Sequence, residues 1–389
     1  MIKISIPSSK SIYQRLLILS SLAQTPSTIN NPSRAGDCKF LENSMKLCGI
    51  KIIHTGNSIL IKPAPVLFPD VPINCGDGGT TVRFMSSLSL LSDKPLHLDV
   101  EGSMKKRPVS GLLESLEKLG VKHNGKFPLT LERQSCRSEA FVDTSLTSQF
   151  LSSLILVCPS RKIDTKITYK SNPVSSTYIS MTERCLNYYN IGFSHNADSY
   201  SFSPVIYDGI ETTVEPDASA AALFEAFRPH FKKEFQLTSG TDEFDFSKSI
   251  QGDSIFYSFQ KQINEQVNFE FDISSTPDLI VPLTLTGILG SDPINIRGIT
   301  HTYHKESRRP EILKNELAKV GCKIDISQNE MTVYPGINKN SATLDPHADH
   351  RLAMAFGFLS IVSKGISVKN KDCTVKSFPD FFSELEKLR

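Results

Sequence analysis

A short capping cluster followed by an almost wholly apolar helix recurs six times along the chain. The first cluster, Ser8-Ser9, follows an alternating strand within residues 1–8, and its apolar run ends at Ala23. Small and polar residues at a helix start satisfy the free backbone N–H groups. A helix that is apolar on nearly every side must be buried, so we expect six buried helices whose N-termini point to a common place. The five later clusters are Asp77-Gly78-Gly79-Thr80-Thr81, Thr147-Ser148-Gln149, Glu215-Pro216-Asp217-Ala218-Ser219, Pro277-Asp278 and Asp349-His350-Arg351.

More amphipathic helices alternate with the apolar ones, and each is expected to end in a short strand. Gly49, Gly120 and Gly192 stand near the ends of the first three and are 71 and 72 residues apart. Such spacing, with six helix starts in 389 residues, predicts an internal repeat of about 65 residues. The helix-to-strand segments are residues 45–52, 116–123, 186–195 and 317–324.

Length and charge favour an enzyme of two domains that works in the cytoplasm. A chain of 389 residues is long for one core. Its formal net charge of +2 gives no reason to expect a nucleic acid or membrane partner. The start of the chain lacks the pattern of a signal peptide, and no apolar run approaches a membrane span. The eight cysteines include no CxxC pair, so we expect reduced, mostly buried thiols and no metal site.

The first capping cluster carries the residues of an anion site. Lys10, Ser11 and Arg15 follow Ser9 directly, and Ser11 and Arg15 share one face of the helix because they are four residues apart. A helix N-terminus already favours negative charge, so a phosphate or carboxylate is the expected ligand. The alternative is an ordinary capped helix with exposed basic residues.

Similar donors occur at the later helix starts of the first half. Residues 76–81 form a Gly-rich turn whose backbone N–H groups could approach an anion closely. The loop of residues 101–108 holds three adjacent cations, although such loops are also common on solvated surfaces. Hydroxyl groups gather at 147–149 and 175–178 and would suit a polyhydroxylated ring, but they are also ordinary helix caps.

The second half contains the densest charged motif. Glu306 is three residues from Arg309, and Lys305 is four residues from it, so on a helix the acid would sit in a basic cradle. A surface network of ion pairs is the alternative. Asp278, at the start of an apolar helix, is either a catalytic carboxylate or only a cap.

Together these motifs resemble the 5-enolpyruvylshikimate-3-phosphate (EPSP) synthase family, in unbroken order from Ile6 to the C-terminus. The resemblance implies an α/β (α+β) fold of two similar domains, each with three βαβαββ repeats in an inverted, barrel-like arrangement and the active site in the cleft between them. We assign residues 9–214 to one domain and 1–8 with 215–389 to the other. The motifs are Ser9-Lys10-Ser11 with Arg15, Gly79-Thr80 with Arg83, Met104-Lys105 with Arg107-Pro108, Ser148-Gln149-Phe150, Lys305-Glu306-Ser307 with Arg309, Asp349-His350-Arg351 with Met354-Ala355, and Cys373-Thr374 with Lys376 and Phe378-Pro379.

The resemblance implies transfer of the enolpyruvyl group of phosphoenolpyruvate to the 5-hydroxyl of shikimate-3-phosphate, with release of phosphate. Both substrates are anions, which accounts for the many arginines and lysines. The residues implied for phosphoenolpyruvate are Lys10, Gly79, Arg107, Gln149, Arg309, Arg351 and Lys376. Those implied for shikimate-3-phosphate are Ser11, Arg15, Thr147, Ser148, Gln149, Ser175, Tyr178, Asp278, His301 and Lys305.

Two proton movements have to be catalysed, because the hydroxyl loses a proton and the methylene carbon gains one. The resemblance implies a catalytic set of Asp278, Glu306, Lys10 and Lys376. Asp278 is the base or orients the hydroxyl, and either Glu306 or Lys376 is the acid. The basic neighbours of Glu306 favour its ionised form, so the sequence leaves that choice open. Addition and elimination need no cofactor, and we expect none.

Several departures from the family pattern bear on the site. Asp77 stands where Asn is usual, Arg308 where Asp is usual, and His301 where an Asn often contacts the shikimate phosphate. The sister enzyme that uses UDP-N-acetylglucosamine as acceptor is the nearest alternative, but no cysteine lies between Cys75 and Cys136, where its mobile loop carries one. A non-catalytic anion-binding relative is the alternative from another class. A monomer is the family expectation.

Overall fold

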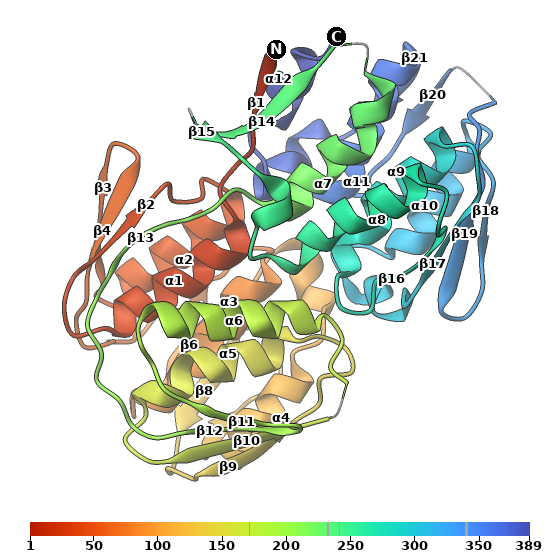
Figure 1. Cartoon of the computed structure of the whole chain (residues 1–389). Helices are drawn as coiled ribbons and strands as arrows, with labels where there is room; N and C mark the ends of the chain where they lie inside the picture. Colours follow the sequence, from red (N-terminus) through yellow and green to blue (C-terminus); the bar gives the residue numbers. More distant parts are fainter. Residues whose placement is uncertain (171, 232, 241, 339–340) are drawn as a thin grey trace. The chain divides into compact units, whose positions relative to one another are not determined.

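The chain forms two compact units in the computed structural model, which describes residues 1–170, 172–231, 233–240, 242–338 and 341–389. The N-terminal unit is Ser9–Glu215, and the C-terminal unit joins Met1–Ser8 to Pro216–Arg389 (Figure 1). Strand β1 (Ile2–Ser5) belongs to the C-terminal unit because it pairs in parallel with β14 (Phe235–Ser239). The first residues of the chain therefore complete a sheet formed by its second half.

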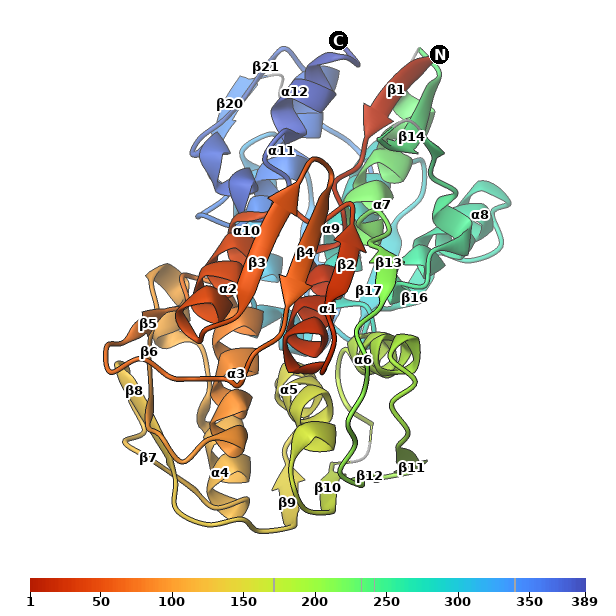
Figure 2. The ribbon, with the colours of Figure 1, turned by 90° about the vertical axis from the view of Figure 1, so that its left-hand side faces the viewer.

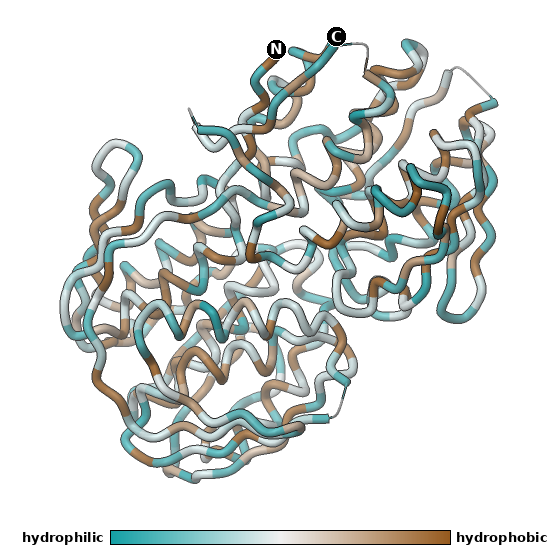
Figure 3. The backbone as a smooth tube through the Cα atoms, viewed as in Figure 1, coloured by the Kyte–Doolittle hydropathy of each residue, from teal (hydrophilic) through white to brown (hydrophobic). Residues whose placement is uncertain are grey.

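Helices of two kinds alternate in the N-terminal unit, as the sequence predicts. The apolar helices α1, α3 and α5 pack against one another, and in α5 every residue from Phe150 to Val157 is buried. In Figure 3 brown, apolar residues recur along these helices. The helices are α1 (Lys10–Leu22), α2 (Gly36–Leu47), α3 (Gly79–Ser87), α4 (Ser110–Lys118), α5 (Gln149–Val157) and α6 (Ser176–Tyr188).

Three four-stranded sheets of this unit repeat one pattern: a parallel pair followed by two antiparallel neighbours. The orders are β13-β2-β4-β3, β5-β6-β8-β7 and β9-β10-β12-β11. Figure 2 shows β2, β4 and β3 side by side over α1 and α2. The strands are β2 (Ser27–Asn30), β3 (Lys51–Thr55), β4 (Ser58–Lys62), β5 (Ile73–Asn74), β6 (Leu96–Asp99), β7 (Val121–His123), β8 (Leu129–Arg133), β9 (Glu139–Val142), β10 (Thr165–Tyr169), β11 (Ser194–Asn196), β12 (Ser199–Phe202) and β13 (Glu211–Thr213).

The C-terminal unit has the same plan with shorter sheets. The apolar helices α7, α9 and α11 pack against one another, and the sheet β16-β17-β19-β18 repeats the four-stranded pattern. The sheets β1-β14-β15 and β20-β21 are abbreviated, and no sheet of the described residues closes into a barrel. The helices are α7 (Ala218–Phe227), α8 (Phe256–Asn264), α9 (Ile280–Leu289), α10 (Arg309–Ala318), α11 (His350–Val362) and α12 (Phe381–Glu386). The remaining strands are β15 (Asp242–Glu243), β16 (Glu270–Asp272), β17 (Ile294–Arg297), β18 (Ile324–Ile326), β19 (Glu330–Val333), β20 (Ser341–Leu344) and β21 (Gly365–Val368).

Aromatic side chains fill the core between α7, α11 and α12. The ring of Phe358 lies 4.9 Å from that of Phe224 in an edge-to-face contact and 4.5 Å from that of Phe227. Phe381 of α12 adds an edge-to-face contact with Phe358 at 5.5 Å. Such pairs stabilise beyond the burial of their surface, so this cluster fixes α7 and α11. The first turn of α11 carries the predicted site residue Arg351.

Of the first three helix-to-strand segments, two have the expected glycine just after the helix and the third does not. Gly49 and Gly120 follow α2 and α4 with φ of 92° and 100°, a conformation that glycine adopts without a steric penalty. After α6 the left-handed residue is Asn190, with φ of 52°, so the repeat was wrongly aligned on Gly192. Asparagine tolerates this conformation better than most residues, which explains why glycine spacing alone misplaced the helix end.

Two further findings concern the whole chain. The eight cysteines are all free, and six of them are buried. Among the described residues, no helix is both long and apolar enough to cross a lipid bilayer.

Candidate active site

In the N-terminal unit, the first turn of α1 is tied to the starts of α2 and α3. Lys10 donates to Asp37 at 2.8 Å, and both side chains are largely buried. Gln14 donates to the Asp37 carbonyl at 3.3 Å and to Thr81 at 3.0 Å. Lys10 is therefore held in a fixed position at a place where helix N-termini converge. Sequence reasoning missed Asp37, although an acid in the first turn of a helix was its signal.

Two arginines close around Gly79 at the start of α3. A Cβ atom added to Gly79 would lie 2.8 Å from Arg83 and 2.9 Å from Arg107, so only glycine lets both guanidinium groups approach the backbone here. Arg83 also donates to the side chain of Gln149, the first residue of α5, and to the Pro108 carbonyl at 2.8 Å. The structure thus brings the predicted residues Gly79, Arg107 and Gln149 together and adds Arg83. Two arginines beside a helix N-terminus form a site suited to an anion.

Asp77 is engaged by the neighbouring loop. Its carboxylate accepts hydrogen bonds from the Ser103 hydroxyl at 2.7 Å and from the Met104 backbone N–H at 2.8 Å. These contacts hold the 3₁₀ helix η2 (Gly102–Lys106), which leads directly to Arg107. Asp77 therefore positions the basic loop.

Arg15 joins α1 to α6 and is nearly inaccessible. Its guanidinium donates to Thr182 at 2.8 Å, to the Ser11 carbonyl at 2.8 Å and to the Tyr178 carbonyl at 3.0 Å. Burial lowers the pKa of Arg15 to about 10, so the side chain still carries its charge at neutral pH. Ser11, Arg15 and Tyr178 are thus brought together, with Arg15 as the tie between the two helices.

The predicted hydroxyl groups occupy helix starts. Thr147 caps α5 by accepting from the Gln149 N–H at 3.2 Å, and Ser148 is buried beside it. Ser175 precedes α6 with φ of 56° and is also buried. A non-glycine residue in this region is unfavourable and is often found at functional sites.

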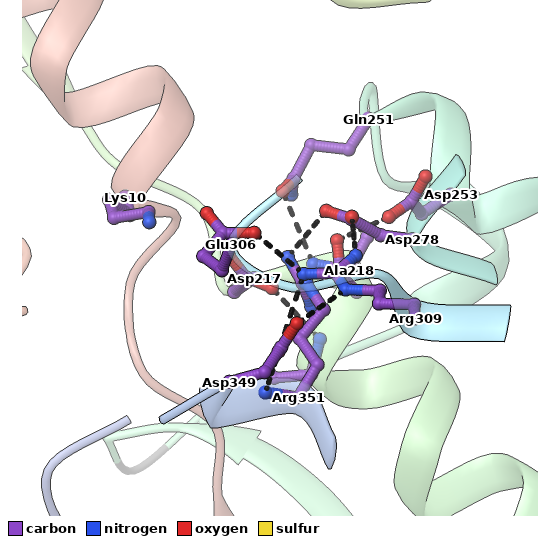
Figure 4. A network of polar contacts seen from close by, with 12 residues as sticks. Lys10, Asp217, Ala218, Gln251, Asp253, Asp278, Glu306, Arg309, Asp349 and Arg351 are labelled. Carbon is purple, nitrogen blue, oxygen red and sulfur yellow. Dashed lines mark hydrogen bonds and ion pairs between the residues drawn. The ribbon is translucent and has the colours of Figure 1, made fainter. Parts of the chain in front are cut away.

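In the C-terminal unit, carboxylates from separate elements converge on Arg309 (Figure 4). The guanidinium contacts Asp349 at 2.8 Å, Asp278 at 2.5 Å and Glu306 at 2.9 Å. Asp349 is also the N-cap of α11 and accepts from the Ser307 hydroxyl at 2.9 Å. The starts of α10 and α11 and the turn before α9 therefore meet in one buried ionic cluster.

This arrangement corrects the prediction of an acid in a basic cradle. Glu306 and Arg309 do pair, but Lys305 to Arg308 are not helical, because α10 begins only at Arg309. Pro310, in the first turn, explains this start, since proline is favoured there and restricts the residue before it. Arg309 is thus enclosed by acids, rather than Glu306 by bases. Its partners Asp278 and Asp349 lie 31 and 40 residues away in the sequence.

Asp278 is an ionised carboxylate in a strongly positive surrounding. It lies on the 3₁₀ helix η7 (Pro277–Leu279) and pairs with Arg351 at 2.8 Å as well as with Arg309. Burial alone would raise the pKa of Asp278, but Arg351, Arg309 and Lys305 together hold it well below its usual range. Asp278 is therefore a strong hydrogen-bond acceptor at neutral pH and a weak base while these contacts last.

Two other predicted residues of this unit, His301 and Lys376, lie on 3₁₀ segments, and Lys305 directly follows the first of these segments. Burial, followed by the charge of Lys305, lowers the pKa of His301 to about 3, so His301 is neutral at physiological pH. Its Nε2 atom is buried, with no hydrogen-bond partner among the described residues. Lys376 ends η9 (Lys371–Lys376), which packs against α11, and is half-buried. Arg308 points to the surface, where it pairs with Glu311 at 2.6 Å.

A further buried group was missed by sequence reasoning. Asp253, on η6 (Gly252–Ile255), accepts a hydrogen bond from the Ser219 hydroxyl in the first turn of α7. Gln251 accepts from the Ala218 N–H at 3.2 Å and donates to the Pro216 carbonyl at 2.7 Å. No local sequence pattern marked Asp253, because its burial is seen only in the structure. Within the described residues, no three His, Cys, Asp or Glu side chains are arranged to bind a metal ion.

Comparisons with known proteins agree on one family over nearly the whole chain. The family model described as EPSP synthase (3-phosphoshikimate 1-carboxyvinyltransferase) matches residues 2–228 and 250–385. The 3-phosphoshikimate 1-carboxyvinyltransferase of Methanosphaerula palustris is 28% identical, with 97% of this chain and 95% of the relative covered. That of Shewanella piezotolerans is 29% identical, with 99% and 96% covered.

Solved structures agree on the fold. EPSP synthase from Acinetobacter baumannii superimposes with a TM-score of 0.79 at 16% identity, over 99% of this chain and 95% of that one. The enolpyruvyl transferase NikO from Streptomyces tendae gives 0.74 at 12% identity, over 100% and 94%. These structural likenesses confirm the predicted α/β fold, and the family match extends across both units. The chain belongs to the EPSP synthase family.

Proposed function

We propose that this protein transfers the enolpyruvyl group of phosphoenolpyruvate to the 5-hydroxyl of shikimate-3-phosphate, which yields EPSP and phosphate on the shikimate route to chorismate. The observation that carries the proposal is the family match over residues 2–228 and 250–385. Every predicted site residue, from Lys10 to Lys376, lies within the matched segments.

The cluster around Gly79 supports binding of phosphoenolpyruvate. Arg83 and Arg107 both approach Gly79, and Asp37 holds Lys10. Guanidinium groups can bind phosphate or carboxylate in a bidentate way, whereas a lysine acts as a point charge. Orientation of two bound substrates can account for up to about 7–11 kcal/mol of the barrier, so the fixed positions of these donors matter as much as their charge.

We assign shikimate-3-phosphate to the hydroxyl and amide groups at the starts of α5 and α6, and to Lys305 and His301 as further ligand-binding residues. Ser175 and Ser148 are buried at these helix starts, and their hydroxyl groups could form hydrogen bonds with a ring hydroxyl. His301 is neutral and its buried Nε2 has no described partner, so it can accept or donate one hydrogen bond to a polar ligand.

Asp278 is assigned to the 5-hydroxyl. Its ionised state suits an acceptor that orients the O–H bond while the oxygen attacks C2 of phosphoenolpyruvate. For Asp278 to take the proton fully, Arg351 would have to turn from Asp278 towards a substrate anion. The Asp278 carboxylate would then be more basic. The C3 methylene is protonated to a methyl group in the same addition. Loss of one proton from this methyl group, with departure of phosphate from C2, restores the double bond and completes the reaction.

Glu306 and Lys376 remain the two candidates for the acid. The contact of Glu306 with Arg309 at 2.9 Å favours its carboxylate form, which must be overcome before Glu306 can donate a proton. Arg309 is surrounded by carboxylates, so its binding of phosphoenolpyruvate would require one of these contacts to be exchanged.

We further propose that the protein acts as a monomer in the cytoplasm. One copy supplies every predicted site residue, so no second copy is needed to complete the set. Its free thiols suit a reducing compartment. Light scattering of the purified chain would give the mass expected for one copy, about 43.2 kDa.

The proposal is tested by identifying the product and by one matched pair of variants. Mass spectrometry of a reaction with both substrates should detect EPSP. Asp278→Asn should lower kcat at least 100-fold, an effect typical of losing a positioned acid or base, about 10²–10⁴. Asp325→Asn, at an exposed aspartate of the same unit, should leave kcat unchanged. Absence of EPSP with folded wild-type protein would refute the proposal.

A further inference from the structure

Asp253 is a buried carboxyl group that lies next to the candidate catalytic cluster without being part of it. Its relative exposure is 3%, and its one described side-chain partner is the Ser219 hydroxyl. Figure 4 shows its carboxyl group beside Asp278. Two aspartates from separate 3₁₀ segments, η6 and η7, are thus placed side by side against the first turn of α7.

The position of Asp253 is fixed by its own segment. Gln251 binds the backbone at both Pro216 and Ala218, and the Gln251 carbonyl accepts from the Ser254 N–H at 3.0 Å. These bonds attach η6 to the N-terminus of α7, so Asp253 has little freedom to turn away from Asp278. A carboxyl group held beside another carboxylate, in a buried place, affects the charge of its neighbour.

The charged groups that act on Asp253 lie on η7, α11 and the start of α7. Asp278 of η7 and Asp217 at the start of α7 disfavour its ionisation, whereas Arg351 of α11 favours it. The 3₁₀ helix η5 (Phe246–Lys248) and α8 also pack against η6, but their cations Lys248 and Lys261 are exposed. Burial, then the charge of Asp278, raises the pKa of Asp253 to about 7. Asp253 thus changes its charge near neutral pH.

Such a change matters most for Arg351. This arginine already pairs with Asp278 at 2.8 Å and is predicted to bind phosphoenolpyruvate. An ionised Asp253 adds a second negative charge near Arg351, which reduces the attraction that remains for a substrate anion. A protonated Asp253 leaves that attraction intact.

We propose that Asp253 is a positioning residue that controls, through Asp278 and Arg351, how tightly the enzyme holds phosphoenolpyruvate. This inference rests on the proposed function and adds to it a residue that need not contact substrate. It requires the affinity for phosphoenolpyruvate to fall above pH 7, while turnover of the bound substrates changes little.

The experiment measures KM and kcat from phosphate release as a function of pH for the wild type and three variants. Asp253→Asn should remove the alkaline rise in KM for phosphoenolpyruvate, so its KM above pH 8 should be lower than the wild-type value by roughly threefold to tenfold, the effect of one partly screened charge. Ser219→Ala removes a hydrogen bond that stabilises the carboxylate form and should move the rise to higher pH. Asp245→Asn, at an exposed aspartate, should reproduce the wild-type profile. The phosphate group of the substrate also titrates, but it does so equally with all four proteins. Its effect therefore cancels when the KM of a variant is divided by the wild-type KM at the same pH.

An infrared titration of the unliganded proteins provides a readout that does not depend on turnover. A protonated carboxyl band that disappears near pH 7 in the wild type and is absent in Asp253→Asn would support the proposal. A wild-type rise in KM that persists unchanged in Asp253→Asn would overturn it. If Asp253→Asn does not fold, two other results together would overturn the proposal. These are a pH profile of KM in Ser219→Ala that matches the wild type, and a wild type without a carboxyl band that titrates near pH 7. A wild type that shows the band but releases no phosphate would refute the proposed function, while the titration of Asp253 would stand.

Discussion

We expect Arg309→Met to destabilise the C-terminal unit strongly, because it removes the cation on which three carboxylates converge. The Arg309 side chain is 1% exposed and that of Asp349 is 0% exposed, so water cannot replace the lost contact between them. Methionine is long and apolar and fills much of the same space, which limits the effect of a cavity. The substitution therefore tests charge compensation more than packing.

The expected size follows from the contacts that remain. Removing one partner of a buried ion pair costs about 3–5 kcal/mol. Asp278 keeps Arg351 at 2.8 Å, and Asp349 keeps the Ser307 hydroxyl at 2.9 Å. We therefore expect a loss of about 3–4 kcal/mol in the free energy of unfolding at pH 7.5, the lower part of that range.

The pH dependence gives the sign of the electrostatic effect. In the wild type the pKa of Asp278 is held well below its ordinary value of 3.8, so its contribution is present above that value and is lost only as the pH falls through the lower, folded value. Without Arg309 the folded pKa of Asp278 rises, so the variant can protonate the group at milder acidity. The difference between variant and wild type should shrink as the pH falls towards about 4.

Urea unfolding followed by circular dichroism measures this effect, since the chain has no tryptophan for fluorescence. The transition of the unit that contains Arg309 should move to lower urea concentration. Arg308→Met is the matched control, because this neighbouring arginine is exposed and pairs with Glu311 on the surface, where ion pairs contribute little. An Arg309→Met transition at the wild-type urea concentration, or a difference that grows on acidification, would refute the reasoning.

Three other predictions concern single side chains. Glu306→Gln should lower kcat by roughly 10²-fold or more with folding intact; a kcat near the wild-type value in stopped assays would remove Glu306 from the mechanism. Asp37→Asn should raise the KM for phosphoenolpyruvate without a comparable change in kcat, because Lys10 loses the carboxylate that fixes it at 2.8 Å; an unchanged KM would show that Lys10 needs no such support. Asp253→Asn should unfold at higher urea concentration than the wild type above pH 7. An acid whose folded pKa is raised to about 7 makes the fold less stable as the pH rises from the ordinary value of 3.8 to about 7, where the loss is complete; equal midpoints at pH 8 would contradict this.

The six apolar helices could be predicted from the sequence because the necessary information is local. Capping residues stand directly before each apolar run, and in Ser9, Asp217 and Asp349 the side chain accepts from a backbone N–H of the first turn. The same pattern predicts that all six helix starts point to one place. Within each unit, the structure does bring helix starts together. The helix end at Asn190 could not be placed from glycine spacing, because asparagine can adopt the same backbone conformation.

The contacts inside the candidate site depend on residues that are distant in sequence and could not be predicted in this way. Spacing alone indicated that Glu306 would accept from basic neighbours, whereas the fold surrounds Arg309 with acids from two other elements. Asp253 gave no signal at all, since its importance depends on burial beside Asp278. Local patterns thus predict where charged residues gather, but the tertiary fold decides which of them pair.

Phosphate release from phosphoenolpyruvate, measured in parallel with shikimate-3-phosphate and with UDP-N-acetylglucosamine as acceptor, tests the central claim most directly. The sister enzyme with UDP-N-acetylglucosamine as acceptor is the nearest alternative that the sequence leaves, so the choice of acceptor is the decisive observation. We predict release with shikimate-3-phosphate alone. Release only with UDP-N-acetylglucosamine, or release with neither from a protein that both ligands stabilise against heat, would contradict the assignment.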